Sequence, residues 1–145
     1  MTDIQQMLMA QEGTGPMAHG RYFPYQDSVG RWTLGFGRNI TDNGISHDEA
    51  LLLLNGDICD ALDAVKQCCS CYDTLSRPRQ LVMLSLSYNL GQDRLSGFVR
   101  FLGALHRGAW EECADELLDS LAARQCPLRY QQLAAMMREN VSTWI

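Results

Sequence analysis

The hydrophobic pattern of the chain changes near Ser46, and this change constrains the fold more than any other feature. Before it, aromatic and aliphatic residues lie in two short segments, roughly 22–27 and 31–37, on either side of a Ser-Val-Gly-Arg turn, as in a β-hairpin. After it, apolar residues recur every three or four positions, which is the period of amphipathic helices. The sequence therefore predicts an α+β fold with a small hairpin lobe and a larger helical lobe.

Capping motifs predict where the helices begin. Two S/T-x-x-E/Q boxes, starting at Thr2 and Ser46, indicate a first helix over 2–12 and a long helix that connects the lobes. Further helices are expected over 78–91, 96–108 and 109–120 and from Pro127 onward. The Gly- and Pro-rich residues 13–21 are expected to form a loop, and a third short strand is expected to include Ile40.

The length of 145 residues suits one compact domain that spans 1–145. We expect lobe 1 to cover about 13–45 and lobe 2 to cover about 60–145, with the N-terminal helix 2–12 packed against lobe 2. A chain with two lobes is expected to have a cleft between them, where ligands tend to bind. We also expect the protein to be a monomer.

Charge and hydropathy exclude several classes of partner. A net charge of −5 argues against nucleic acid, because phosphate binding needs a basic surface. The longest purely aliphatic run, Leu51 to Leu54, is too short for a membrane anchor, and the N-terminus lacks the basic and apolar regions of a signal peptide. We therefore expect a protein that is made in a cytoplasm and at first stays there.

Six cysteines include one C-x-x-C motif, from Cys68 to Cys71. A zinc or redox site is one interpretation of this motif, but no second C-x-x-C or paired His supports it. Ordinary reduced thiols are the expected state of cysteines in a cytoplasm. The sequence therefore predicts no metal ion and no organic cofactor.

Two carboxylates and a hydroxyl form the candidate catalytic set. Glu12 lies at the expected C-terminal end of the first helix, in line with apolar residues, and both surroundings favour its protonated form. Asp27 lies at an exposed strand end and is expected to stay ionised, with the Thr33 hydroxyl placed to hold a water beside it. One protonated and one ionised carboxyl group beside a saccharide bond is the arrangement of a glycoside hydrolase.

Strand alternation suggests a binding surface for this set. It places the bulky side chains of Trp32, Leu34 and Phe36 on one face and leaves Thr33, Gly35 and Gly37 on the other, where a sugar ring would fit. Simpler interpretations stand beside these: Glu12 as a solvated acid, Asp27 as a turn former, and the two glycines as bend positions. The GFGRNI stretch is no phosphate-binding fingerprint, because Ile40 holds the third Gly position.

These motifs resemble the phage-type lysozymes, the endolysins of glycoside hydrolase family 24. The resemblance rests on the order of Glu12, Asp27 and Thr33, and on the stretches WTLGFGRNI, DNGISHDEA, RPRQLVMLSLSYNLG and GFVRFLGALHRGAWEECADELLDS. It covers nearly the whole chain and implies a lysozyme-like fold. The implied reaction is hydrolysis of the β-1,4 bond between N-acetylmuramic acid and N-acetylglucosamine in bacterial peptidoglycan, for lysis of a host cell.

The resemblance also implies roles for the catalytic set. Glu12 would be the general acid, Asp27 the carboxylate that assists the water, and Thr33 the hydroxyl beside it. Because peptidoglycan lies outside the cytoplasm, a separate holin-type protein would be needed to open the membrane.

Four further residues are implied to bind the substrate. Tyr25 and Leu34 would border the saccharide groove from the hairpin lobe. Asn89 would reach the substrate from the helical lobe, although a simple helix cap is the other interpretation. Arg129 would pair with the catalytic Glu12, although a surface arginine is nearly as plausible.

Three features depart from the family pattern. Fourteen residues separate Glu12 from Asp27, a longer link than the family has, and His19 within it is either a substrate contact or a solvated loop residue. An Arg-Trp pair that the family often has near Leu121 and Ala122 is absent, and a charge of −5 is unusual for an enzyme that acts on an anionic wall. These departures favour the alternative of a non-catalytic peptidoglycan-binding or virion-structural protein on a lysozyme scaffold. A lytic transglycosylase, which needs only the acid, is a weaker rival.

Overall fold

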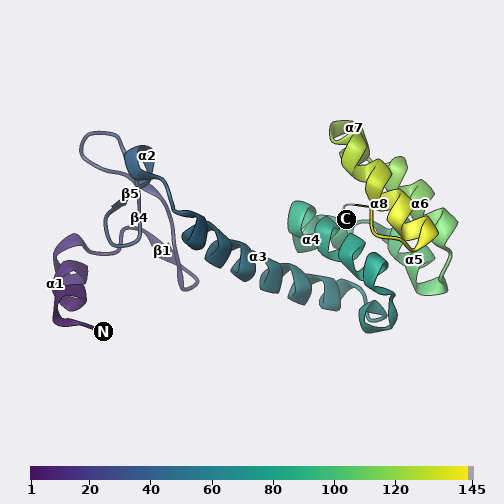
Figure 1. The fold of residues 1–145 in the computed structure, drawn as a ribbon, viewed down its shortest axis with the longest axis horizontal. Coiled ribbons are helices and arrows are strands. Elements are labelled where there is room, and N and C mark those ends of the chain that lie inside the picture. The colour runs from purple at the N-terminus through teal and green to yellow at the C-terminus, as the bar shows by residue number, and fades with distance from the viewer. Residues whose placement is uncertain (144–145) are drawn as a thin grey trace. The chain divides into compact units, whose positions relative to one another are not determined.

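The computed structural model describes residues 1–143 and divides into two compact units. The N-terminal unit is Met1–Leu52 and the C-terminal unit is Leu53–Ile145. Figure 1 shows the β-strands gathered in the first unit and helices alone in the second. This distribution confirms the predicted α+β fold, with a small hairpin region before a larger helical part. The expected cleft between lobes, and the packing of helix 2–12 against lobe 2, stay predictions.

Short elements make up the N-terminal unit. They are α1 (Asp3–Glu12), β1 (Met17–Ala18), β2 (Arg21–Tyr22), β3 (Tyr25–Gln26), β4 (Trp32–Leu34), β5 (Arg38–Asn39), α2 (Ile40–Asn43) and the start of α3 (His47–Cys68). β1 and β2 form an antiparallel hairpin, which we call the β1–β2 hairpin. The strands β3, β4 and β5 form a separate antiparallel sheet with β4 in its centre, where Thr33 lies opposite Tyr25 and Asn39.

Four local predictions in this unit were wrong. The region 13–21 contains β1 and the start of β2 and is therefore no simple loop. The predicted strand 22–27 is interrupted after Tyr22, because Pro24 has no N–H for a ladder. Ile40 begins α2 instead of joining a strand, because the Asn39 side chain caps that helix through Asp42 N. The predicted strand 31–37 ends at Leu34.

Both capping boxes are confirmed. At α1, the Thr2 backbone N–H donates to Gln5 Oε1 at 2.7 Å, and Gln5 N donates back to Thr2 Oγ1 at 3.3 Å. At α3, Ser46 N donates to Glu49 Oε2 at 2.7 Å, and Glu49 N donates to Ser46 Oγ at 3.2 Å. Each reciprocal pair satisfies backbone donors that the first helical turn leaves without partners.

Helices that follow one another through short connections build the C-terminal unit. They are the rest of α3, a 3₁₀ turn (Tyr72–Thr74), α4 (Arg77–Ser96), α5 (Val99–Arg107), α6 (Trp110–Leu118), α7 (Leu121–Gln125) and α8 (Pro127–Glu139). Pro78 and Pro127 lie at the helix starts, as predicted. The predicted stop at Gly91 is a kink within α4, where this glycine has φ 75° and ψ 169°. The short helix α7 was not predicted.

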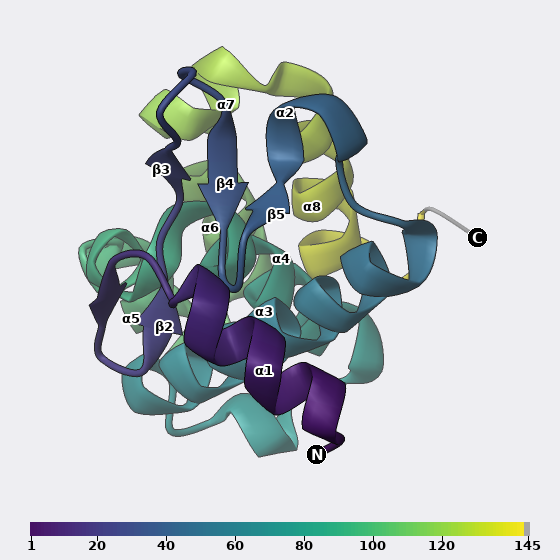
Figure 2. The same cartoon turned by 90° about the vertical axis from the view of Figure 1, so that its left-hand side faces the viewer.

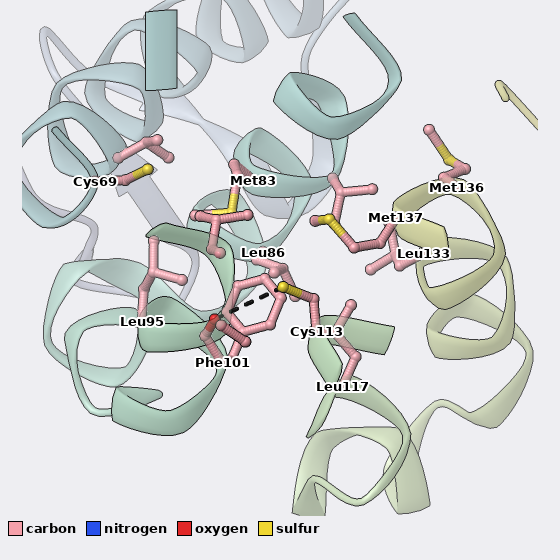
Figure 3. Packing of buried hydrophobic residues seen from close by; sticks show 14 of the residues in the cluster. Cys69, Met83, Leu86, Leu95, Phe101, Cys113, Leu117, Leu133, Met136 and Met137 are labelled. Carbon is pink, nitrogen blue, oxygen red and sulfur yellow. Dashed lines mark hydrogen bonds between the residues drawn. The ribbon is translucent and has the colours of Figure 1, made fainter. Parts of the chain in front are cut away.

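The hydrophobic core lies in the C-terminal unit. Figure 3 shows side chains from α4, α5, α6 and α8 that converge on one another. The largest fully buried ones include Phe101, Met83, Leu86, Leu95, Leu105, Leu117, Met136 and Met137. Among the described residues of the N-terminal unit, by contrast, Thr33 alone is buried. Over residues 1–143, no helix combines the length and the apolar character that a bilayer crossing requires.

Candidate functional site

Glu12 ends α1, and its carboxylate lies against the turn between β4 and β5. Gly13 stops the helix with φ 70°, and its N–H donates to Met9 O. A Cβ atom at Gly37 would lie 3.0 Å from Glu12 Oε2, and Gly37 has φ 81°, which side chains rarely adopt. Figure 2 shows the end of α1 beside this turn. The Glu12 side chain is itself exposed.

This contact corrects the predicted glycine face. Gly35 and Gly37 lie after the end of β4, with φ 61° and 81°, and so belong to a tight turn instead of one face of a strand. The alternative interpretation of bend positions was right. Gly37 leaves room for the carboxylate of Glu12, not for an open platform.

Asp27 begins the turn between β3 and β4. Its Oδ1 accepts the backbone N–H groups of Val29 and Arg31, both at 2.9 Å, and its own N–H donates to Arg31 O at 2.9 Å. The turn-forming interpretation is therefore correct, since Asp shapes turns through such bonds. These turn bonds use Oδ1 and hold the carboxylate in a defined orientation.

Thr33 is joined to Asp27 through the backbone of Arg31. Its Oγ1 donates to Arg31 O at 3.2 Å, while Arg31 N donates to Asp27 Oδ1. Thr33 is 5% exposed, so it does not lie on the open face that the alternation predicted. Two of the predicted catalytic residues are thus brought together by one turn, and the third, Glu12, lies against the next turn of the same unit.

Tyr25 and Leu34 are both half-buried. The Tyr25 ring lies over Gly15, because a Cβ there would lie 2.3 Å from Tyr25 Cε1. Leu34 lies at the end of β4, paired with Arg38. Their predicted place at the border of a saccharide groove stays a prediction.

Asn89 and Arg129 contact each other within the C-terminal unit. Arg129 Nη1 donates to Asn89 Oδ1 at 2.7 Å, and Asn89 Nδ2 donates to Ser85 O at 2.6 Å. Sequence reasoning named both residues but did not predict that they pair. The pairing of Arg129 with Glu12 stays a prediction.

The β1–β2 hairpin and the β4–β5 turn each add one aromatic residue that sequence reasoning did not assign to the site as part of a pair. His19 and Gly20, with φ 51° and 73°, form the tip of the hairpin. Tyr22, at its end, makes an edge-to-face contact with Phe36 of the β4–β5 turn. The available signal was the aromatic residue between two glycines, Gly35-Phe36-Gly37, which interrupts an otherwise regular strand pattern.

The cysteines do not assemble a metal site within residues 1–143, where no three His, Cys, Asp or Glu side chains cluster suitably. All six are free thiols, and the Sγ atoms of Cys69 and Cys71 lie 3.3 Å apart. Burial raises the pKa of Cys69 to about 12, assisted by its hydrogen bond to Cys71. Burial also raises the pKa of Cys113 to about 11. These two thiols are therefore protonated at neutral pH.

Comparison with known protein families identifies the family of this chain. Residues 18–137 match the family described as phage lysozyme. The matched segment contains Asp27 and Thr33 and also Asn89 and Arg129, and it begins after Glu12. Since the match spans most of the chain, from the β1–β2 hairpin to α8, the chain belongs to the phage lysozyme family, of the glycoside hydrolase family 24 kind.

Proposed function

We propose that this chain is an endolysin that hydrolyses the β-1,4 bond between N-acetylmuramic acid and N-acetylglucosamine of peptidoglycan, for lysis of a host cell. One observation supports it above the others. In a member of the phage lysozyme family, the Glu12 carboxylate lies against Gly37, in the same unit as the Asp27 and Thr33 pair. Two carboxyl groups and a hydroxyl in one small unit are the groups that glycoside hydrolysis needs.

In this proposal Glu12 is the general acid. It donates its proton to the glycosidic oxygen as the bond to the anomeric carbon breaks, and positive charge develops on the sugar ring. Asp27 assists the water that attacks this carbon, through the carboxylate oxygen that its turn leaves unused. Thr33 acts beside Asp27 by holding the turn residue Arg31 in place and by offering its hydroxyl oxygen as an acceptor.

The proposal also gives the four predicted binding residues a role. Tyr25 and Leu34 border the saccharide from the sheet, and Asn89 is proposed as a further substrate-binding residue. The hydrogen bond from Arg129 to Asn89 Oδ1 supports a role for Arg129 in orienting this amide. Peptidoglycan lies beyond the inner membrane, so the proposal includes a separate holin-type protein that gives the enzyme access to it.

Charge-neutral variants test this function. We expect Glu12→Gln to lower the release of reducing ends from purified peptidoglycan by at least about a hundredfold, the usual scale for a general acid. Glu139→Gln is the matched control, because Glu139 is also an exposed last residue of a helix, α8, and should keep full activity. Wild-type activity in Glu12→Gln would contradict the assignment.

Asp27→Asn separates chemistry from folding. The amide keeps an oxygen that can accept from Val29 and Arg31, so the turn should persist while the negative charge is lost. We expect a strong loss of rate without a fall in unfolding temperature. An unchanged rate would point to an enzyme that needs only the acid, and mass spectrometry would then find the anhydro product of a lytic transglycosylase.

The alternative function is a non-catalytic peptidoglycan-binding or virion-structural protein. Besides the three departures described above, it is favoured by the start of the family match after Glu12, which leaves out the proposed acid. Wild-type protein that sediments with peptidoglycan but releases neither reducing ends nor anhydro fragments would establish this alternative and rule out the hydrolase.

A further inference from the structure

We propose that Tyr22 and Phe36 form an aromatic subsite beside Glu12 that binds a sugar ring of the glycan strand. This inference rests on the proposed function, because the ligand is the same peptidoglycan strand. It adds a specificity element that the predicted catalytic and binding residues do not include. The subsite lies wholly within the N-terminal unit.

The two rings are in contact, and both are accessible. Their centroids lie 5.4 Å apart and their planes meet at 61°, an edge-to-face arrangement. Tyr22 is 40% exposed and Phe36 is 38% exposed. Because an edge-to-face contact leaves part of each ring uncovered, the pair presents an angled aromatic surface to solvent.

The aromatic pair lies next to the proposed general acid. Phe36 directly precedes Gly37, where an added Cβ atom would lie 3.0 Å from Glu12 Oε2. Consecutive Cα atoms are about 3.8 Å apart, so the Cα of Phe36 lies close to the glycine that contacts the Glu12 carboxylate. In the view of Figure 2, the end of α1, the β4–β5 turn and β2 are drawn near one another. A glycan strand whose scissile bond lies at Glu12 would therefore extend past these rings.

Aromatic rings suit this ligand for a chemical reason. A pyranose ring carries its polar groups around its edge and presents C–H groups on its faces. The face of an aromatic ring has a negative quadrupole and attracts such weakly positive C–H groups, while the Tyr22 hydroxyl can hydrogen-bond to the sugar edge or to water. Ligand sites combine an apolar lining with a few placed polar groups, and this pair supplies both.

The β1–β2 hairpin is what brings Tyr22 to Phe36. Its tip turns at His19 and Gly20, which both have positive φ. Its base is closed by the hydrogen bond from Phe23 N to Pro16 O at 2.9 Å. This hairpin lies in the fourteen-residue link between Glu12 and Asp27. The hairpin therefore builds one side of the subsite.

Binding without cleavage tests the inference. In a Glu12→Gln background, soluble peptidoglycan glycan chains are titrated by calorimetry into protein carrying Tyr22→Leu or Phe36→Leu, which keep apolar bulk and lose the aromatic ring. We expect Kd to rise about 3- to 10-fold for each, the range that aromatic contacts contribute. Tyr22→Phe should lose less affinity than Tyr22→Leu, because it keeps the ring and removes only the hydroxyl. In the active enzyme, Tyr22→Leu should raise KM and leave kcat nearly unchanged.

Phe23→Leu is the matched control, because Phe23 is a neighbouring aromatic residue, 45% exposed, outside the pair. Equal Kd values for the Leu variants and their parent would overturn the inference, as would an equal loss in Phe23→Leu. A loss of affinity that follows a fall in unfolding temperature would overturn it too, since the pair would then be structural. Failure of the proposed function looks different. In that case the Leu variants would still bind glycan more weakly than their parent, but wild-type protein would release no reducing ends.

Discussion

The two units of this protein are stabilised in different ways. In the C-terminal unit, large apolar side chains such as Phe101, Met83 and Leu117 are almost completely excluded from water. In the N-terminal unit only Thr33 is buried among the described residues, and the conformation is set by capping boxes, turn bonds and glycines with positive φ. The proposed catalytic residues all lie in the N-terminal unit.

The comparison suggests how function and stability are divided. A side chain held by one or two hydrogen bonds can be positioned without a large apolar core around it, and strained backbone is often found at functional sites. Substitutions in the N-terminal unit should therefore change activity more than stability, and substitutions in the C-terminal core should do the reverse. Four predictions test this division, beginning with the largest expected effect.

Phe101→Ala should destabilise the protein most, by about 3–5 kcal/mol. Phe101 is 1% exposed, and its ring packs edge-to-face on Phe98, so the substitution leaves a cavity in the core. Val99→Ala in the same helix is the control, because Val99 is 73% exposed and should change stability little. Urea denaturation measures both, and equal effects would show that the core is not the main source of stability.

Arg79→Ala should have an intermediate effect, of about 2 kcal/mol. The Arg79 guanidinium lies 3.8 Å from the centre of the Trp110 ring, and Nε donates to Met137 O at 2.9 Å, so one side chain joins α4, α6 and α8. Arg100→Ala is the control, because its side chain is 81% exposed and its ion pair with Glu116 is long at 3.8 Å. Thermal denaturation measures both variants, and an equal fall in unfolding temperature would contradict this role.

Gly37→Ala should affect activity more than stability. A left-handed conformation costs a non-glycine residue about 1–2 kcal/mol, and the new Cβ would also displace Glu12 Oε2. Gly35→Ala is the control, because it has φ 61° but no heavy atom within 4 Å of the new Cβ. Both variants should lose similar stability, and only Gly37→Ala should also lose much of the peptidoglycan-hydrolysing rate. Similar rates in the two would show that the Glu12 contact does not matter.

Glu49→Gln should have the smallest effect, and one that depends on pH. The Ser46 backbone N–H lowers the pKa of Glu49 below its usual 4.5, so the folded state favours the ionised form. This contribution is present above pH 4.5 and is lost as the pH falls through the lower folded pKa. The difference in unfolding temperature between wild type and Glu49→Gln should therefore shrink below about pH 4.5.

Ser46→Ala provides the control for that pH dependence. It removes the capping hydroxyl, at a cost of about 1 kcal/mol, but keeps the backbone N–H that binds Glu49. Its acid-dependent loss of stability should resemble that of wild type. A flat profile in Ser46→Ala would assign the effect to the hydroxyl instead of the N–H.

Features that depend on neighbours in the chain were predicted well. The capping boxes at Thr2 and Ser46, the helix start at Pro127 and the turn at Asp27 all formed where the sequence placed them. Hydrogen bonds that span two to four residues stabilise the capping boxes and the Asp27 turn. The fixed φ of Pro127 suits the first helical position. The information for each feature therefore lies in a short window.

Strand lengths were predicted less well, for a physical reason. The alternating pattern continues through Gly35 and Gly37, but a strand also needs a partner for each backbone N–H and C=O. β5 pairs only as far as Leu34 on β4, and the chain then turns. The β1–β2 hairpin was not predicted either, because its Gly- and Pro-rich composition is typical of a loop.

The sequence by itself therefore determined the fold class and the main helix boundaries, because local bonding and hydrophobic period specify these features. Only the tertiary structure decided which distant residues meet: Glu12 with Gly37, Tyr22 with Phe36, and Arg129 with Asn89. These pairs are separated by 25, 14 and 40 positions, so no periodic pattern links them. Their contacts come from chain folding and packing, which a pattern read along the sequence does not contain.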